Sequence, residues 1–550
     1  MPAHVFSPTF RPLSHCLKSK QAAGPLRTLR CGKDQSGVMN IVPLPHWEFT
    51  IYLLLSIGIH LYSFYEVYLA SKEHEKELDY EFGLEKDPYF LGHRKDSMDF
   101  EWGFWTEWGR WPLIWLMLGH AVVSQLARIW FRKRRPWFLM VYGMVACWLV
   151  LGTKGLTVIF LNVVISYKVA EMKMHLVTWL SSIVMLLIFH VKSVENIQRG
   201  WYGSENEYHL LLFTLTVRCL YYTSFSLEYC SLQENETMDN SFSSMLVYVF
   251  YYPVFHNGPI MTYDEFSNQL QKQDDGCTGF DIYGLVLDVA RLLVWWWLAE
   301  LMIHLMYMHA MFSSYHLLEE ASFWTLGGLA LAQVSFFYVK YLVLYGIPAL
   351  LIRLDGMNPP ALPRCVSTMY SFTRIWRSFD VGLHRFLVRY IYIPMGGSHC
   401  GFCGILLSTA FTFVFMCLWH GAHEYLWYWA LLNWIGIITE QGLKKLLAVS
   451  TVKNRINQWL SPKLYRQIYA ALASISTAFL IFTNLIFLGG EHVGKIYWNR
   501  VFVQGWPWVP LAIFGCLYCF SQIGIEWDTF HFPQYKGSFP LCTSPKLGKS

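Results

Sequence analysis

The stretch CGILLSTAFTFVFMCLW at residues 403–419 is apolar and contains no charged side chain. A helix of about 20 such residues crosses a hydrocarbon layer of about 30 Å. Similar apolar runs recur on both sides of it, at 49–70, 111–131, 174–191, 209–229, 284–312, 324–352, 424–442, 467–489 and 506–525. The sequence therefore predicts an all-α polytopic membrane protein, a bundle of about ten to twelve transmembrane helices.

The composition of the 550 residues agrees with a membrane protein and excludes other classes. Hydrophobic residues make up 54% and charged residues only 15% of the chain, whereas soluble domains carry about 25% charged residues. No basic face with interleaved aromatic residues occurs, so nucleic-acid binding is not expected. The 13 cysteines follow neither a disulfide framework nor a zinc-binding spacing, so we expect no metal site built from cysteine clusters.

Two of the apolar regions contain helix-breaking residues. Region 137–167 is either one long helix or a pair of helices broken at GTKG, residues 152–155. Region 244–261 is short and is interrupted by two prolines and a glycine. Irregular backbone at membrane depth is tolerated only where protein or water satisfies its polar groups. We therefore expect 244–261 to form a re-entrant segment.

The two ends of the chain differ in composition from the region between them. Residues 1–38 carry several basic side chains and one acid, Asp34, without an apolar run. We expect a disordered basic extension there, with an organelle transit peptide as the alternative. Residues 39–525 are expected to form the membrane domain, and residues 526–550 a flexible tail.

The distribution of basic residues predicts the orientation of the first spans. The cluster RKRR at 132–135 follows the run 111–131, and such clusters favour the cytosolic side of a membrane. Region 71–110 would then face the opposite side, and its acids outnumber its basic residues. This acidic region is either a solvated surface or a surface that attracts a basic protein partner.

His420 is the first candidate for chemistry. It directly follows the run 403–419 and precedes Gly421, whose small size lets another molecule approach the imidazole closely. Removal from water would keep the ring neutral, which a general base requires. A lone histidine near a span is also a common packing residue, so a catalytic role is a hypothesis at this point.

Asp380 is the second candidate. It lies in WRSFDVGLH at residues 376–384, which is too polar for a span and too aromatic for a free loop. We expect a helix that lies in the membrane interface or dips into the protein. Asp380 can alternatively pair with Arg377 or His384 in a structural role. Arg377 and the neighbouring arginines can bind a lipid headgroup or a nucleotide phosphate.

No serine nucleophile elbow, P-loop or glycine-rich dinucleotide turn accompanies these residues. The physical features of the chain therefore leave a transporter, a channel and a membrane-embedded transferase open.

The candidate residues resemble the pattern of the membrane-bound O-acyltransferase family. The resemblance lies in Asp380 within residues 376–394, in Trp419-His420-Gly421, and in the broken segment with Tyr252-Pro253 and Asn257-Gly258-Pro259. It covers about residues 43–525, and it is also carried by the stretches 216–228, 295–301 and 359–369. Most relatives have asparagine where Asp380 stands, whereas those that acylate Hedgehog proteins resemble this chain in having aspartate.

The resemblance implies a reaction, its partners and a location. Palmitate would pass from palmitoyl-CoA to the N-terminal cysteine amine of Hedgehog proteins, in the membrane of the endoplasmic reticulum or Golgi, in contact with membrane lipids. The alternatives are a different peptide or lipid acceptor, and a non-catalytic scaffold or transporter.

The resemblance also implies roles for individual residues. His420 would accept a proton from the attacking amine, and Asp380 would orient the donor or assist proton transfer. Trp376 would border the acyl tunnel, and Asn484 would hydrogen-bond the thioester carbonyl. Cys365 would ligate the iron of haem b.

Overall fold

The computed structural model describes residues 41–88, 90, 92–231, 240–274 and 282–531. The expected basic extension at 1–38 lies outside these residues, and so do residues 532–550 of the expected tail. Residues 526–531 continue the last helix, α21.

Helices make up nearly all of the described structure, because a helix satisfies its backbone polar groups within the segment itself. In chain order the elements are α1 (His46–Glu73), α2 (Glu75–Phe82), β1 (Glu85–Lys86), β2 (Arg94–Lys95), α3 (Phe100–Gly103), η1 (Phe104–Trp108), α4 (Arg110–Trp130), η2 (Arg132–Arg134), α5 (Arg135–Glu171), α6 (His175–Ile188), α7 (Lys192–Arg199), α8 (Glu205–Ser231), α9 (Phe242–Val249), η3 (Tyr252–Val254), α10 (Tyr263–Asp274), α11 (Ile282–Leu305), α12 (Met308–Ser313), α13 (Tyr315–Glu320), α14 (Phe323–Leu354), η4 (Val366–Thr368), α15 (Phe372–Ser378), α16 (Val381–Leu387), η5 (Val388–Tyr392), α17 (Gly401–Trp419), α18 (Glu424–Ala448), α19 (Ser450–Trp459), α20 (Pro462–Trp498), η6 (Asn499–Gln504) and α21 (Trp508–His531). The two short strands pair antiparallel, with Glu85 opposite Lys95.

The prediction of an all-α polytopic membrane protein is confirmed, although the number of spans is lower than expected. Among the described residues, eight helices are long and apolar enough to cross a membrane, and nine if α6 and α7, bent by 60°, form one span. The eight are α1, α4, α5, α8, α14, α17, α20 and α21. The expected runs 284–312 and 424–442 do form long helices, α11 and α18. Charged and tryptophan side chains interrupt the apolar sequence of these two helices. Their exclusion accounts for most of the difference between the expected ten to twelve spans and the eight or nine candidates.

Two of the long helices are kinked at glycines. Gly152 in α5 has φ 68° and ψ −175°, and Gly490 in α20 has φ 79° and ψ −176°. Residues with a side chain rarely adopt a positive φ, so glycine is the residue that permits each kink. Of the two arrangements open for region 137–167, the structure has two helical halves joined at Gly152.

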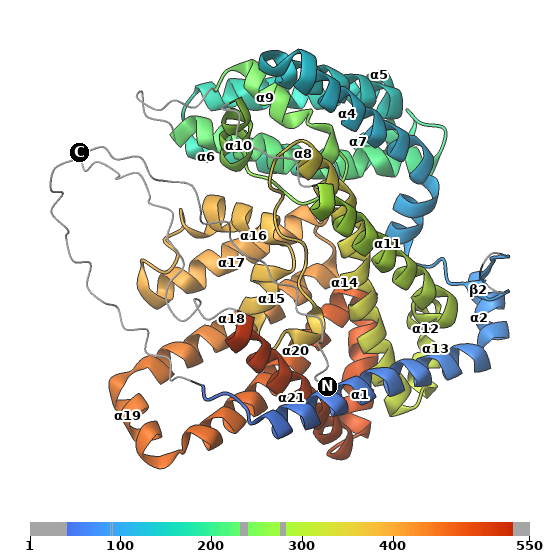
Figure 1. Ribbon diagram of the computed structural model, residues 1–550, viewed down its shortest axis with the longest axis vertical. Coiled ribbons are helices and arrows are strands. Elements are labelled where there is room, and N and C mark those ends of the chain that lie inside the picture. The colour runs from blue at the N-terminus through green and yellow to red at the C-terminus, as the bar shows by residue number, and fades with distance from the viewer. Residues whose placement is uncertain (1–40, 89, 91, 232–239, 275–281, 532–550) are drawn as a thin grey trace. The chain divides into compact units, whose positions relative to one another are not determined.

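Helix α14 connects two groups of helices, which Figure 1 shows in different colours along the chain. In one group, α5 packs on α4, α6, α8 and α9, and in the other, α20 packs on α18 and α21. Helix α14 contacts α1, α11 and α20 and also the irregular turn η3. It therefore runs beside both of the large hydrophobic clusters in the described residues.

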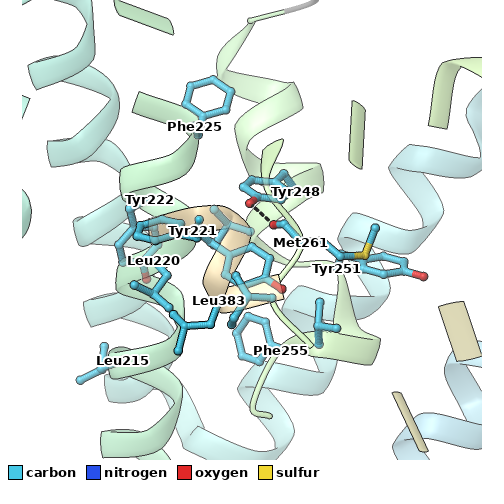
Figure 2. Close-up of a cluster of buried hydrophobic side chains, with 14 of the residues drawn as sticks. Leu215, Leu220, Tyr221, Tyr222, Phe225, Tyr248, Tyr251, Phe255, Met261 and Leu383 are labelled. Carbon is cyan, nitrogen blue, oxygen red and sulfur yellow. Dashed lines mark hydrogen bonds between the residues drawn. The ribbon is translucent and has the colours of Figure 1, made fainter. Parts of the chain in front are cut away.

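The segment around η3 is almost completely buried, and side chains satisfy its backbone. Arg218, buried on α8, donates hydrogen bonds to the carbonyl oxygens of Val249, at 2.8 Å, and of Val254. The Tyr248 hydroxyl donates to the carbonyl oxygen of Met261 at 2.5 Å, among the aromatic rings seen in Figure 2. The segment thus has the protein-satisfied irregular backbone that the re-entrant interpretation requires.

Candidate active site

One cavity brings together residues that lie far apart in the sequence. It has a volume of about 150 Å³ and is lined by side chains from α14 to α20. Four residues singled out from the sequence share its wall: Trp376 from α15, Asp380 before α16, His420 after α17 and Asn484 from α20. Tyr341 and Tyr345 of α14 and Trp429 of α18 also line the cavity, together with further aromatic side chains.

His420 lies at the point where α17 ends and the chain turns away. The turn is made by Gly421, with φ 102°, and Ala422, with φ 57°. The imidazole meets the rings of Trp419 and Phe487 edge to face, with centroids 4.7 and 5.4 Å away. No side chain in the described part of the chain hydrogen-bonds to the imidazole, whose open side faces the cavity.

The surroundings of His420 decide its protonation. Burial lowers the pKa of His420 to about 4, because an imidazolium without a counter-charge is costly away from water. The ring is therefore neutral at pH 7. A neutral imidazole can accept a proton, so the site holds a base that faces the cavity.

Asp380 has both carboxylate oxygens engaged. Oδ1 accepts a hydrogen bond of 2.9 Å from the backbone N–H of Leu383, which makes Asp380 the N-cap of α16. Oδ2 accepts a hydrogen bond of 2.9 Å from the hydroxyl of Tyr345. These hydrogen bonds, from Leu383 on α16 and Tyr345 on α14, hold the Asp380 carboxylate in place. Burial raises the pKa of Asp380 above its usual value.

A glycine determines where Asp380 sits. A Cβ atom on Gly382 would lie 2.2 Å from the carbonyl oxygen of Ile260, so only glycine allows α16 to approach the re-entrant segment this closely. Ile260 directly follows Gly258-Pro259. The broken segment and the Asp380 region, which the sequence presents as separate motifs, therefore pack directly on each other.

Trp376 and Asn484 are fixed by hydrogen bonds at the cavity wall. The indole N–H of Trp376 donates to Oδ1 of the buried Asn433 at 3.3 Å. The side-chain amide of Asn484 donates to the carbonyl oxygen of Leu480 at 2.9 Å. Since a carboxamide nitrogen carries two hydrogens, one remains for a molecule in the cavity.

Arg377 and Cys365 do not line this cavity. Arg377 is exposed on α15, and its charge adds to the effect of burial in lowering the pKa of His384 to about 4. Cys365 is exposed just before η4, and the next residue, Val366, does contribute to the cavity wall. The expected substrate contact of Arg377 thus requires a molecule that extends beyond the cavity.

The structure adds residues that the sequence did not single out. Tyr345 holds Asp380, Asn433 holds Trp376 and Gly382 permits the packing of α16. The one available signal was the spacing of Tyr341 and Tyr345, which puts two hydroxyls on one face of an apolar helix.

A second, larger cavity has a different chemical character. It has a volume of about 390 Å³ and lies between α1, α14, α20 and α21. Its lining contains no aspartate, glutamate, histidine, lysine or arginine. Since reaction chemistry needs groups that exchange protons, the smaller cavity is the candidate active site.

Comparison with known proteins gives consistent matches over most of the chain. Residues 163–483 match the family model described as MBOAT, membrane-bound O-acyltransferase family. The chain is 56% identical over 491 residues to protein-cysteine N-palmitoyltransferase HHAT of Mus musculus, with 88% of this chain and 98% of the relative covered. Protein-cysteine N-palmitoyltransferase Rasp of Drosophila melanogaster is 27% identical, with 87% and 95% covered. The protein-cysteine N-palmitoyltransferase HHAT-like protein of Mus musculus is 26% identical, with 87% and 94% covered.

Proposed function

The chain belongs to the membrane-bound O-acyltransferase family, and we propose that it transfers palmitate from palmitoyl-CoA to the N-terminal cysteine amine of Hedgehog proteins. Its membership of this family and its 56% sequence identity to a protein-cysteine N-palmitoyltransferase support an acyltransferase of this kind. The observation that carries the proposal is that His420 and Asp380, from distant parts of the chain, line one cavity within a membrane protein.

In the proposed reaction the amine attacks the thioester directly. The acceptor ammonium first gives one proton to Asp380 and becomes a neutral amine. Its nitrogen then forms a bond with the thioester carbonyl carbon, while His420 accepts the second proton. The carbon–sulfur bond breaks, and His420 returns its proton to the sulfur, so that CoA leaves as a thiol. No acyl-enzyme is needed, because positioning two reactants side by side already removes much of the entropic barrier.

The membrane setting suits both substrates. A palmitoyl chain gains about 0.8 kcal/mol per buried methylene in apolar surroundings, so the donor reaches the site through the bilayer and its lipids. Exclusion of water limits hydrolysis of the thioester. Arg377, exposed beside the site, is proposed to contact a phosphate of CoA. An acceptor of the secretory pathway places the reaction in the membrane of the endoplasmic reticulum or Golgi.

An acylation assay tests the proposal. Purified protein in nanodiscs is incubated with alkyne-palmitoyl-CoA and a Hedgehog N-terminal peptide. We expect label on the peptide with a free N-terminal cysteine and none on the same peptide with an acetylated N-terminus. Labelling of a different acceptor in place of this peptide would favour another acyltransferase of the family, and absence of any transfer would favour a scaffold or transporter.

Replacing Asp380 with asparagine should slow acylation by about a hundredfold, within the range that removal of a proton-transfer group costs. The amide keeps the size of the side chain but cannot accept the ammonium proton. Asp288→Asn, which alters an exposed ion pair with Arg353, is the matched control and should keep normal activity. Equal rates for Asp380→Asn and the unaltered protein, measured as peptide labelled per minute, would remove Asp380 from the reaction.

We further propose that Cys365 ligates haem b. Its sulfur is free and exposed, so a haem iron could reach it. Cys365 would hold the haem iron through its sulfur, and the bound haem would supply a visible absorption band. Cys365→Ala should then lose the Soret absorption band of the purified protein, while Cys400→Ala, which alters another exposed free cysteine, should keep it. A Soret band of equal height in both variants would exclude Cys365 as the ligand.

A further inference from the structure

A line of polar side chains leads away from Asp380 through the cavity wall. The Tyr345 hydroxyl donates to Asp380 Oδ2 at 2.9 Å. Tyr341 lies one helical turn earlier on α14, and the two rings meet edge to face with centroids 5.1 Å apart. The Tyr341 hydroxyl donates to Glu101, at 3.0 Å from Oε1 and 3.3 Å from Oε2. Both tyrosines line the cavity, so Glu101 is connected to the active site through them.

Glu101 is the outer end of this line. It belongs to α3, in the acidic region 71–110, and its side chain is 27% exposed. Lys340 Nζ lies 3.0 Å from Glu101 Oε2 and also donates to Asp99 at 2.9 Å. Lys340 is only 5% exposed. In the described residues, Lys340 and Tyr341 of α14 contact Glu101, and Lys340 links it to Asp99, which also lies 3.5 Å from His309 of α12.

The proposed acylation releases one proton per turnover, and this proton needs a path out of the site. An N-terminal amine has a pKa of about 7.7–8.0 and arrives mainly as an ammonium ion at neutral pH. Ammonium and acyl-CoA give the amide, CoA thiol and one surplus proton. His420 returns its proton to the thiol, so the surplus proton is the one that the ammonium gives to Asp380. It must leave Asp380 before the next turnover.

We propose that Tyr345, Tyr341 and Glu101 form a relay that carries this proton from Asp380 to solvent on the side of region 71–110. The inference rests on the proposed function and adds a proton exit to it. Each tyrosine hydroxyl accepts one proton and donates its own, so neither residue changes its charge overall. The cavity of about 150 Å³ has room for water between the hydroxyls, since one water occupies about 30 Å³ of liquid. Glu101 is partly exposed, at 27%, so the relay ends at a carboxylate that water can reach.

Tyr341→Phe tests the relay, with Tyr338→Phe as the matched control. Both positions lie on α14, and the control hydroxyl is outside the cavity, its ring packing on Trp295. Acylation rates are measured from pH 6.5 to pH 9 with saturating palmitoyl-CoA. We expect Tyr341→Phe to be about tenfold slower at pH 6.5 and to approach the normal rate near pH 9, where the acceptor arrives as a free amine and has no proton to export. Tyr338→Phe should match the unaltered protein throughout.

The pH dependence separates a relay from a structural role. A loss of rate that is equal at every pH would mean that the Tyr341 hydroxyl only supports the fold, and the relay would be wrong. An unchanged rate at pH 6.5 would also overturn it. Glu101→Gln is a second test. The glutamine keeps a hydrogen-bond partner for the Tyr341 hydroxyl but cannot take up the proton, so its acylation rate should show the same recovery at high pH. In either negative result the unaltered protein still acylates the peptide, whereas failure of the proposed function would abolish labelling in every variant.

Discussion

Replacing His420 with alanine should abolish palmitate transfer, by about a thousandfold or more, since loss of a general base costs about 10²–10⁴ in rate. The imidazole faces the cavity, and its neighbours are aromatic rings, which cannot replace it as a proton acceptor. Burial lowers the pKa of His420 to about 4, so the neutral base is present throughout the pH range in which the assay is run. The rate of peptide labelling in nanodiscs measures the loss.

The fold should survive this substitution, because no side chain among the described residues hydrogen-bonds to the imidazole. His316→Ala is the matched control, since it removes an exposed imidazole that pairs with Glu320. Both variants should elute normally on size exclusion and unfold at the same temperature. Normal labelling by a folded His420→Ala protein would show that another group accepts the proton.

The second large effect is expected on stability, at Asp355. This carboxylate follows α14 and is completely buried. It accepts hydrogen bonds from His120 at 2.9 Å, from Tyr251 at 2.5 Å and from Ser124, and it lies 3.1 Å from Arg135. The cluster joins α4, α5 and the re-entrant segment to the end of α14. Removing one partner of a buried ion pair leaves an uncompensated charge, at a cost of about 3–5 kcal/mol.

Asp355→Asn should therefore lower the free energy of unfolding by about 3–5 kcal/mol, measured by titration with SDS from mild-detergent micelles. Asp288→Asn, which removes a partly exposed carboxylate paired with Arg353, should cost about 1 kcal/mol or less. Although burial opposes ionisation, His120 and Arg135 hold the pKa of Asp355 below its usual value. The stabilisation is thus present above about pH 4, the unfolded value, and is lost as the pH falls through the lower folded value. Equal stability of the two variants would contradict this account.

The sequence predicted the architecture because length and polarity of an apolar run are local properties. The run 403–419 forms α17. In region 137–167, where the sequence left one helix or two open, the kink lies at Gly152. The number of spans was harder to predict, since α11 and α18 are long helices whose charged and aromatic side chains make apolar length a poor guide.

The candidate site could be predicted only in part. His420 and Asp380 are unusual in their local sequence, and both line the cavity. Tyr345 is not unusual, because a tyrosine in an apolar helix has many structural roles. Its role is visible only once α14 lies beside α16 and brings together residues that are 35 positions apart. Arg377 shows the opposite case, since this basic residue is close to Asp380 in sequence but is exposed and does not line the cavity.

The contact between Gly382 and Ile260 limits the substitutions that this enzyme tolerates at position 382. A Cβ atom at position 382 would lie 2.2 Å from the main-chain oxygen of Ile260, and a main-chain oxygen cannot rotate aside as a side chain can. A displacement of about 1 Å at a reacting group costs about a hundredfold in rate. A methyl group at position 382 would shift α16 and Asp380, and would therefore slow catalysis while most of the fold stayed intact. The position of Asp380 in the site thus depends on a residue without a side chain. Any other amino acid at position 382 adds at least one methyl group, so no smaller change is available there.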